Sequence, residues 1–360
     1  MPIRDDPQRI AALSRVGHLL MLLTAIPYLW LTLSQIRLSM SGYAGLYAVR
    51  TESTQVAIAS IAGNLFVSGL LFAMAGSIRH RVHARLLLAL ALGDVTVSLF
   101  VGTRGRAFML LFAVLFVWTK LFGALSKPTA ATLIVASLFA VPLVSILRNL
   151  PAAERLAPAQ VTDALQEVQN PAIATLNDMG LSFAPTAFTI ELVPIRRDFE
   201  WGLSYLRAIA LVTPLSGRTL SSEDNPVLLG DWLIREVDQR TAADNGGLGF
   251  SFIAEAYLNF GIIGAPIACG GIGYMLAWLL FRVWTLPSIA FVSSVLLSLL
   301  LFSRGETGVT LRGIVWTSVI PIAAVELLRR RAARTSLRAS SLARPGSVKV
   351  EIPQTPCVRF

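Results

Sequence analysis

Two arginines, Arg104 and Arg106, stand between two apolar runs in the string Thr103-Arg104-Gly105-Arg106. A guanidinium group is planar, stays charged at physiological pH and donates paired hydrogen bonds to phosphate oxygens. Positioned arginines therefore stabilise the charge that grows on a departing diphosphate. We interpret both residues as diphosphate-binding, in a tight turn that Gly105 allows. Snorkelling toward lipid headgroup phosphates is the alternative.

Three further arginines extend this candidate site. Arg304 lies in Ser303-Arg304-Gly305-Glu306, and Arg196 and Arg197 lie in a long polar segment. We predict that all three bind the same diphosphate. An ion pair between Arg304 and Glu306 is the open alternative for that residue.

A displacement that expels such a group also calls for a base that takes the proton of the attacking group. The predicted catalytic acids are Glu255 and Asp198, with Glu191 and Asp94 as further candidates. Glu255 would alternatively stabilise the positive end of its own helix as a first-turn acid. Asp94 lies inside an apolar run, where an arginine is its alternative partner.

The apolar runs beside these residues are long enough to cross a membrane. Hydrophobic residues make up 54% of the 360 and charged residues 14%, and about 20 helical residues cross a hydrocarbon core of roughly 30 Å. We therefore predict an all-α polytopic membrane protein. Its eight transmembrane helices are expected near residues 16–35, 54–78, 86–102, 107–125, 129–147, 253–281, 286–303 and 311–328.

These spans divide the chain into four parts. Residues 1–147 carry helices one to five, and residues 148–252 form a large, partly helical periplasmic loop. Residues 253–328 carry helices six to eight, and residues 329–360 are expected to be a disordered cytoplasmic tail.

Basic residues set the orientation of these spans. They collect in the N-terminal stretch, in residues 79–85, at Lys127, at Arg282 and in the tail, which all fall on one side of eight spans. Short basic connections mark the cytoplasmic side, so both termini are expected there. Residues 103–106, 148–252 and 304–310 then share the outer side. All three histidines fall near the cytoplasmic side, which argues against an outer catalytic histidine.

The charge distribution agrees with a membrane protein. Residues 148–252 hold 13 of the 21 acidic residues and eight arginines, while the whole chain carries a net charge of +10. The surplus of positive charge therefore lies outside the loop, and nucleic acid is not an expected partner. The two cysteines show no metal-ligand spacing, so neither a disulfide, a metal nor a cofactor is predicted.

The 148–252 loop is too long for a simple connection and is expected to carry structure. Residues 157–169 have helical spacing of apolar residues, and residues 172–192 and 201–213 are apolar enough to lie against the membrane. The loop either packs as a lid or also contacts substrate.

Three strings carry a resemblance to a known family: Gly102-Thr103-Arg104-Gly105, the stretch from Ile195 to Tyr205, and Ile253-Ala-Glu-Ala-Tyr-Leu-Asn-Phe-Gly-Ile-Ile-Gly264. In these strings, which lie within about a third of the chain, it resembles the Wzy-type O-antigen and oligosaccharide repeat-unit polymerases. The resemblance implies a metal-independent glycosyltransferase on the periplasmic face of a bacterial inner membrane. It implies glycan transfer from undecaprenyl diphosphate to the non-reducing end of another lipid-linked repeat unit.

The implied partners are the undecaprenyl-diphosphate-linked donor and acceptor, membrane lipids and a chain-length regulator. Two other functions stay open from the residues alone. A lipid-linked oligosaccharide flippase would use the same arginines without breaking bonds, and an accessory subunit of an envelope polysaccharide complex would use the loop to dock a partner.

Overall fold

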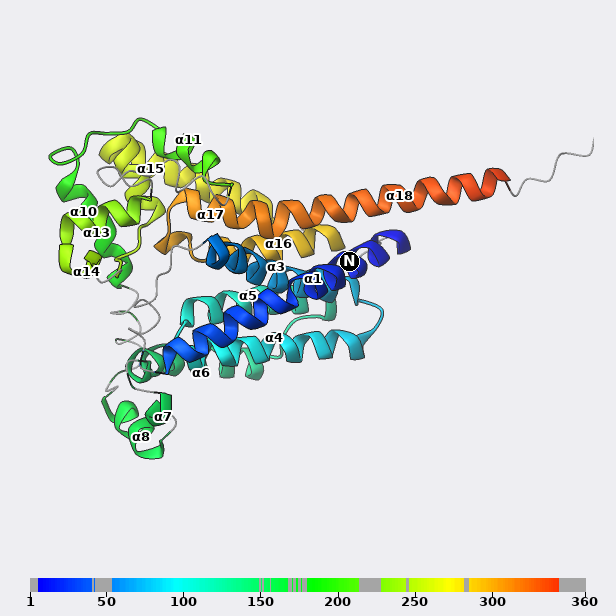
Figure 1. The fold of residues 1–360 in the computed structure, drawn as a ribbon, viewed down its shortest axis with the longest axis horizontal. Coiled ribbons are helices and arrows are strands. Elements are labelled where there is room, and N and C mark those ends of the chain that lie inside the picture. The colour runs from blue at the N-terminus through cyan, green and yellow to red at the C-terminus, as the bar shows by residue number, and fades with distance from the viewer. Residues whose placement is uncertain are drawn as a thin grey trace, which may run out of the picture.

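The computed structural model consists of helices and their connections throughout the residues that it describes (Figure 1). Those residues are 6–40, 42, 54–148, 150, 152–155, 157–167, 170, 173, 176, 180–213, 228–243, 246–281 and 285–342. Eight helical stretches within them are long and apolar enough to cross a membrane. The predicted all-α polytopic fold with eight spans is therefore confirmed.

The candidate spans follow the predicted apolar runs closely. Five precede the loop: α1 (Pro7–Ser39), α3 (Thr54–Gly76), α4 (Arg81–Val101), α5 (Arg104–Phe122) and α6 (Lys127–Leu147). The other three are α15 (Phe252–Phe281), α16 (Leu286–Leu299) with the short helix η2 (Phe302–Arg304), and the run of α17 (Thr307–Ile314), the π-helical η3 (Val315–Val319) and α18 (Ile320–Leu342).

Several helices extend past the predicted ends of their spans, and α1 begins at Pro7 and ends at Ser39 rather than at residues 16 and 35. The third span begins at Arg81 rather than at residue 86, because the basic residues of its first turn continue the helix beyond the apolar run. Long basic side chains at a helix end reach the membrane surface, so they are compatible with a span. At the other end of the chain, α18 continues to Leu342. Part of the predicted disordered tail is thus helical, and residues 343–360 lie outside the described residues.

The membrane core is centred on α1 and α3, which approach each other closely. A Cβ atom added to Gly17 of α1 would lie 2.3 Å from the backbone nitrogen of Ala73, and one added to Gly76 of α3 would lie 2.5 Å from the nitrogen of Ser14. Only glycine fits at these contacts, and small residues allow such backbone approach between membrane helices. Buried residues of α4, α5, α16 and α18 complete this core.

The loop helices gather at one end of the membrane bundle, while α1 begins and α18 projects at the other end (Figure 1). They are α7 (Ala152–Arg155), α8 (Pro158–Glu167), η1 (Leu181–Phe183), α10 (Ala184–Leu192), α11 (Leu203–Ala210), α13 (Leu229–Val237) and α14 (Gln239–Ala243). A second apolar core forms where α13 packs on the start of α15, with Trp232, Leu233 and Leu258 at its centre. This core fixes part of the loop on the membrane helices.

The first part of the loop is fixed by a buried arginine, Arg155, which is 3% exposed. Its guanidinium donates to the carbonyl oxygens of Ser39 (2.7 Å), Phe100 (2.7 Å), Leu150 (2.9 Å) and Arg148 (3.0 Å). Three of these carbonyls lie at the C-terminal ends of α1, α4 and α6, where backbone acceptors lack helical partners and the helix dipole is negative. Arg155 therefore joins three membrane helices at their loop-side ends.

Substitution of Arg155 tests how much its hydrogen bonds stabilise the protein. We expect Arg155→Ala to lower the free energy of unfolding by roughly 3 kcal/mol or more, because each hydrogen bond from a charged donor contributes about 1.5–3 kcal/mol. Arg155→Lys should recover only part of the loss, since an ammonium group lacks the planar fork. Thermal unfolding of the purified protein in detergent measures both changes, with Arg240→Ala, at an exposed position of α14, as the control. Equal stability of Arg155→Ala and that control would contradict the role.

Candidate functional site

A cavity of about 240 Å³ lies among α3, α4, α5, α16, α17 and η3, at the end of the bundle that faces the loop helices. Its polar lining consists of Asn64, Asp94, Arg106, Ser298, Arg304, Thr310 and Thr317. Two of the predicted diphosphate-binding arginines, Arg106 and Arg304, are thus brought into one cavity from connections that are far apart in the sequence. Asp94 is an acidic residue of the same lining.

Arg106 is held loosely within this cavity. Its Nη2 atom lies 3.5 Å from Oδ1 of Asp94, beyond the usual 2.7–2.9 Å of a charge-assisted hydrogen bond. The hydroxyl of Tyr28 donates to the same Oδ1 atom at 2.7 Å, and the guanidinium lies 5.8 Å from the centre of the Tyr28 ring. Asp94 is thus an arginine partner, as the sequence allowed, but the pair leaves most guanidinium hydrogens available to another group.

The turn that precedes Arg106 differs from the predicted one. Gly102 adopts the left-handed conformation that ends α4, with φ of 92°, whereas Gly105 lies inside the first turn of α5. Arg104 is the first residue of α5 and is half-buried, so both arginines occupy the helical first turn rather than a loop. The prediction that Gly105 forms the turn is wrong, because Gly102 already supplies the positive φ that reverses the chain.

The first turn of α5 concentrates positive charge. It contains Arg104 and Arg106, has no acidic residue and receives no side-chain cap from Thr103. The N-terminal end of a helix is itself partly positive, and its unpaired amide groups favour anions. Two arginines at this position are unfavourable for the isolated helix, so this end of α5 is strongly positive.

Arg304 reaches the cavity from the end of η2. The residue is exposed, and among the described residues its guanidinium forms no hydrogen bond or ion pair. Glu306, the alternative partner considered from the sequence, instead accepts a hydrogen bond from the backbone amide of Leu229 at the start of α13. The alternative considered from the sequence, an ion pair between Arg304 and Glu306, is therefore not formed.

The opposite wall of the cavity includes the π-helical segment η3. Thr317 of this segment donates to the carbonyl of Gly313 at 2.8 Å, while its own carbonyl accepts from the hydroxyl of Ser68. Such wide turns are uncommon and occur frequently at functional sites, because they displace a side chain from its regular helical position. Here the irregular turn faces the same space as Arg106 and Arg304.

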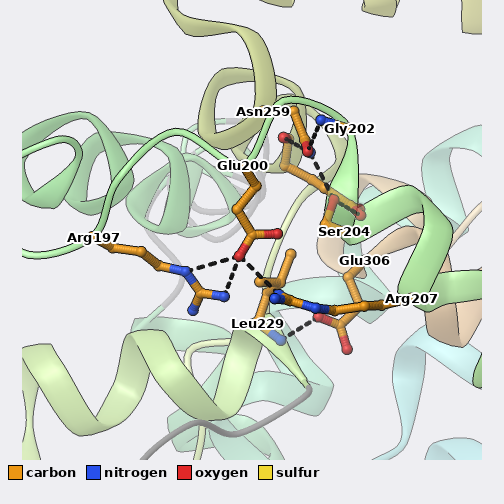
Figure 2. A network of polar contacts seen from close by, with 9 residues as sticks. Arg197, Glu200, Gly202, Ser204, Arg207, Leu229, Asn259 and Glu306 are labelled. Atoms are coloured by element: carbon orange, nitrogen blue, oxygen red, sulfur yellow. Dashed lines mark hydrogen bonds and ion pairs between the residues drawn. The ribbon is translucent and has the colours of Figure 1, made fainter.

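A further predicted arginine, Arg197, lies in a polar network of the loop (Figure 2). Arg197 donates from Nε to Oε1 of Glu200 at 3.0 Å and lies 4.8 Å over the ring of Trp232. Arg207 binds the same carboxylate oxygen at 3.0 Å. Arg197 is therefore occupied by structural contacts, while its neighbour Arg196 is exposed, and neither residue lines the cavity.

Glu255 joins three helices. It is 1% exposed, and its two carboxylate oxygens accept from Oγ of Ser204 in α11 at 2.9 Å and from the amide of Thr307 at the start of α17 at 2.6 Å. The acid thus stabilises the positive end of α17, whereas the sequence suggested that it would cap its own helix, α15. Asn259, one turn later, donates to Ser204 at 2.6 Å and accepts from the amide of Gly202 at 2.8 Å (Figure 2).

Neither predicted catalytic acid lines the cavity. Glu255 lies where the loop meets the membrane bundle, in the contacts with Ser204 and Thr307 that form the joint between them. Asp198 and Glu191 are exposed on the loop. Sequence reasoning did not identify Glu200, Arg207 or Ser204, which build this joint, although Ser204 lies in one of the strings that carried the family resemblance. Among the described residues, no three His, Cys, Asp or Glu side chains gather into a group that could hold a metal ion.

Glu306 adds a second carboxylate to the joint. It is 6% exposed and precedes α17, and burial, opposed by the amide of Leu229, raises the pKa of Glu306 to about 8. The nearby carboxylates of Glu255 and Asp231 raise the pKa further. At neutral pH the Glu306 carboxyl group is therefore mostly protonated and adds little negative charge beside the cavity.

A family model described as O-antigen polysaccharide polymerase Wzy matches residues 5–334 of the chain. The matched region contains the whole cavity and the whole loop. Neither a curated protein nor a solved structure matches the chain significantly.

The raised pKa of Glu306 predicts a pH dependence of stability. The folded protein binds this proton up to about pH 8, whereas an unfolded chain releases it near pH 4.3. Stability should therefore fall as the pH rises from about 5 to about 8 and then level off. Glu306→Gln should remove this component, and Glu236→Gln, at an exposed position of α13, should keep it. Thermal unfolding between pH 5 and pH 9 measures the slope; identical slopes in both variants would refute the assignment.

Proposed function

Because the chain belongs to the O-antigen polysaccharide polymerase Wzy family, we propose that it polymerises lipid-linked oligosaccharides on the periplasmic face of a bacterial inner membrane. In this proposal the enzyme transfers a glycan from undecaprenyl diphosphate to the non-reducing end of a second lipid-linked repeat unit. Both chain termini lie in the cytoplasm, in agreement with the basic connections on that side.

The observation that carries the proposal is the presence of Arg106 and Arg304 in one cavity at the loop-side end of the membrane bundle. The diphosphate of a lipid-linked sugar lies at the membrane surface, at the depth where these helices end. Arg106 contributes one cation together with the positive end of α5, and Arg304 contributes a second cation from a separate connection. Two guanidinium groups on different elements suit a diphosphate, which presents two phosphates to separate partners.

These arginines act on the departing group in the proposed reaction. As the bond between the anomeric carbon and the phosphate oxygen breaks, its electron pair stays on the diphosphate. Arg106 and Arg304 donate hydrogen bonds to that growing charge, and removal of one such donor typically raises the barrier by about 2.7–4 kcal/mol. Arg104 adds charge to the same helix end and is proposed to bind the lipid diphosphate from its rim.

In the proposed mechanism, residues of the loop and its neighbouring helices position the arginines or contact the glycan. Arg197 keeps the segment before α11 in place through Glu200, and Glu255 fixes α17 directly after the turn that carries Arg304. Arg196 and Asp198 are exposed on the loop and are proposed to contact the glycan rather than the diphosphate. The flippase alternative shares the arginines but predicts no bond cleavage.

Arginine substitutions in the cavity test the proposed function. Arg106→Ala and Arg304→Ala should each reduce polymer formation by about 100-fold to 1,000-fold, because each removes a donor to the leaving diphosphate. The lysine variants should recover a minor part, since they keep charge but lose paired hydrogen bonding. Polymer length and amount are measured with purified enzyme and lipid-linked repeat units, with protein levels matched.

Arg240→Ala is the control, because this exposed arginine of α14 lies outside the cavity. Full-length polymer from both alanine variants would contradict the proposed site. Movement of the lipid-linked glycan across the membrane without any polymer from the wild-type enzyme would support the flippase instead.

A further inference from the structure

Asp94, which lines the cavity, has an unused hydrogen-bond acceptor. The residue is 9% exposed, and its Oδ1 atom accepts from Tyr28 at 2.7 Å and from Arg106 at 3.5 Å. Its Oδ2 atom is buried and, within the described part of the chain, has no hydrogen-bond partner. A buried carboxylate oxygen without a partner is costly, so it is uncommon in a structural ion pair.

The geometry differs from that of an ion pair which serves only to hold Arg106. A carboxylate that neutralises an arginine commonly does so with two parallel hydrogen bonds of 2.7–2.9 Å. Here only one oxygen takes part, and the distance is 3.5 Å. The hydroxyl of Tyr28, whose ring stacks on Phe66 with 4.1 Å between the ring centres, donates to the same Oδ1 atom. Asp94 is thus fixed by the tyrosine while half of its accepting capacity stays unused.

The other acids that the sequence suggested lack this combination. Glu255 uses both oxygens in bonds to Ser204 and Thr307, and Asp198 is exposed away from the cavity lining. Asp94 is the acid that lines the cavity together with Arg106 and Arg304. Rotation about the terminal torsion of an aspartate, which is broad and roughly two-fold, exchanges its two oxygens. Either oxygen can thereby face a group in the cavity.

We propose that Asp94 accepts the proton of the acceptor sugar hydroxyl during glycan transfer, an inference that rests on the proposed polymerase function. The hydroxyl oxygen forms a bond to the anomeric carbon of the donor. The bond from that carbon to the phosphate oxygen breaks, and its electron pair leaves on the lipid diphosphate. The hydroxyl proton passes to the Asp94 carboxylate, so that charge and atoms balance without a further reactant.

Proton transfer to Asp94 also changes the state of Arg106. While Asp94 is ionised, it attracts part of the positive charge of Arg106. Once the carboxyl group is neutral, that attraction is lost, at the moment when the diphosphate gains negative charge. Because opposite charges attract strongly in a poorly solvated site, this transfer directs Arg106 to the leaving group. A single aspartate thereby links deprotonation of the acceptor to stabilisation of the diphosphate.

The test separates binding from turnover in the full-length enzyme, reconstituted in nanodiscs. Undecaprenyl diphosphate is the binding probe, and polymer formation from lipid-linked repeat units is the turnover measurement. Asp94→Asn keeps the size and one acceptor atom but removes the charge and the base. We expect turnover to fall about 100-fold or more, while binding of the diphosphate is unchanged or tighter because Arg106 has lost its counter-ion. Asp163→Asn, at an exposed position of α8, is the matched control.

Two outcomes would overturn the inference while leaving the polymerase proposal intact. One is an Asp94→Asn enzyme that retains turnover within threefold of wild type. The other is a loss of diphosphate binding that equals the loss of turnover, since Asp94 would then merely hold Arg106. Failure of the wild-type enzyme to bind the diphosphate at all would instead remove the proposed function itself. Asp94→Glu should retain more turnover than Asp94→Asn, because it restores a carboxylate, and the reverse order would count against a base.

Discussion

The outer part of the molecule depends on buried carboxyl groups that accept hydrogen bonds from the first amides of helices other than their own. Glu255 of α15 accepts the first amide of α17, and Glu306, which precedes α17, accepts the first amide of α13. The two contacts form a chain that runs from a membrane helix through the last span to the loop. Because each acid is buried, water cannot replace it, and loss of either contact leaves a helix end unsatisfied.

This chain sets the position of the cavity's second cation. Arg304 lies two residues before Glu306, between η2 and α17, so the contacts that fix α17 also fix the connection that carries Arg304. Arg106 is fixed independently by the Gly102 turn and by its weak contact with Asp94. The two arginines therefore belong to separately held elements. A ligand that bridges them would connect the first half of the membrane bundle to the loop and the last span.

Hydropathy was sufficient to predict the eight spans, because membrane helices must satisfy their own backbone groups and bury continuous apolar runs. The positions of basic residues likewise predicted that Arg106 and Arg304 share one side. Pattern alone did not distinguish these two from Arg196 and Arg197, which have the same residue type and the same predicted side. That difference arises from the contacts of Arg197: Glu200, three residues later, binds its guanidinium, and the ring of Trp232, which is distant in sequence, lies against it. Gly102 and Gly105 were similarly equivalent in sequence, and only the backbone conformation of α4 decides between them.

The acidic composition of the loop is unfavourable for a neighbouring diphosphate site, since residues 148–252 carry 13 acids against eight arginines. The acids where the loop meets the membrane helices, however, contribute little charge to the cavity. Glu200 is paired with two arginines, Glu255 faces a helix N-terminus, and the Glu306 carboxyl group is mostly protonated at neutral pH. Arg304, by contrast, has no acidic partner among the described residues, and Arg106 has only a distant one. The Asp94 carboxylate that lines the cavity is thus outnumbered there by two arginines and the positive end of α5, although the surrounding loop is negative.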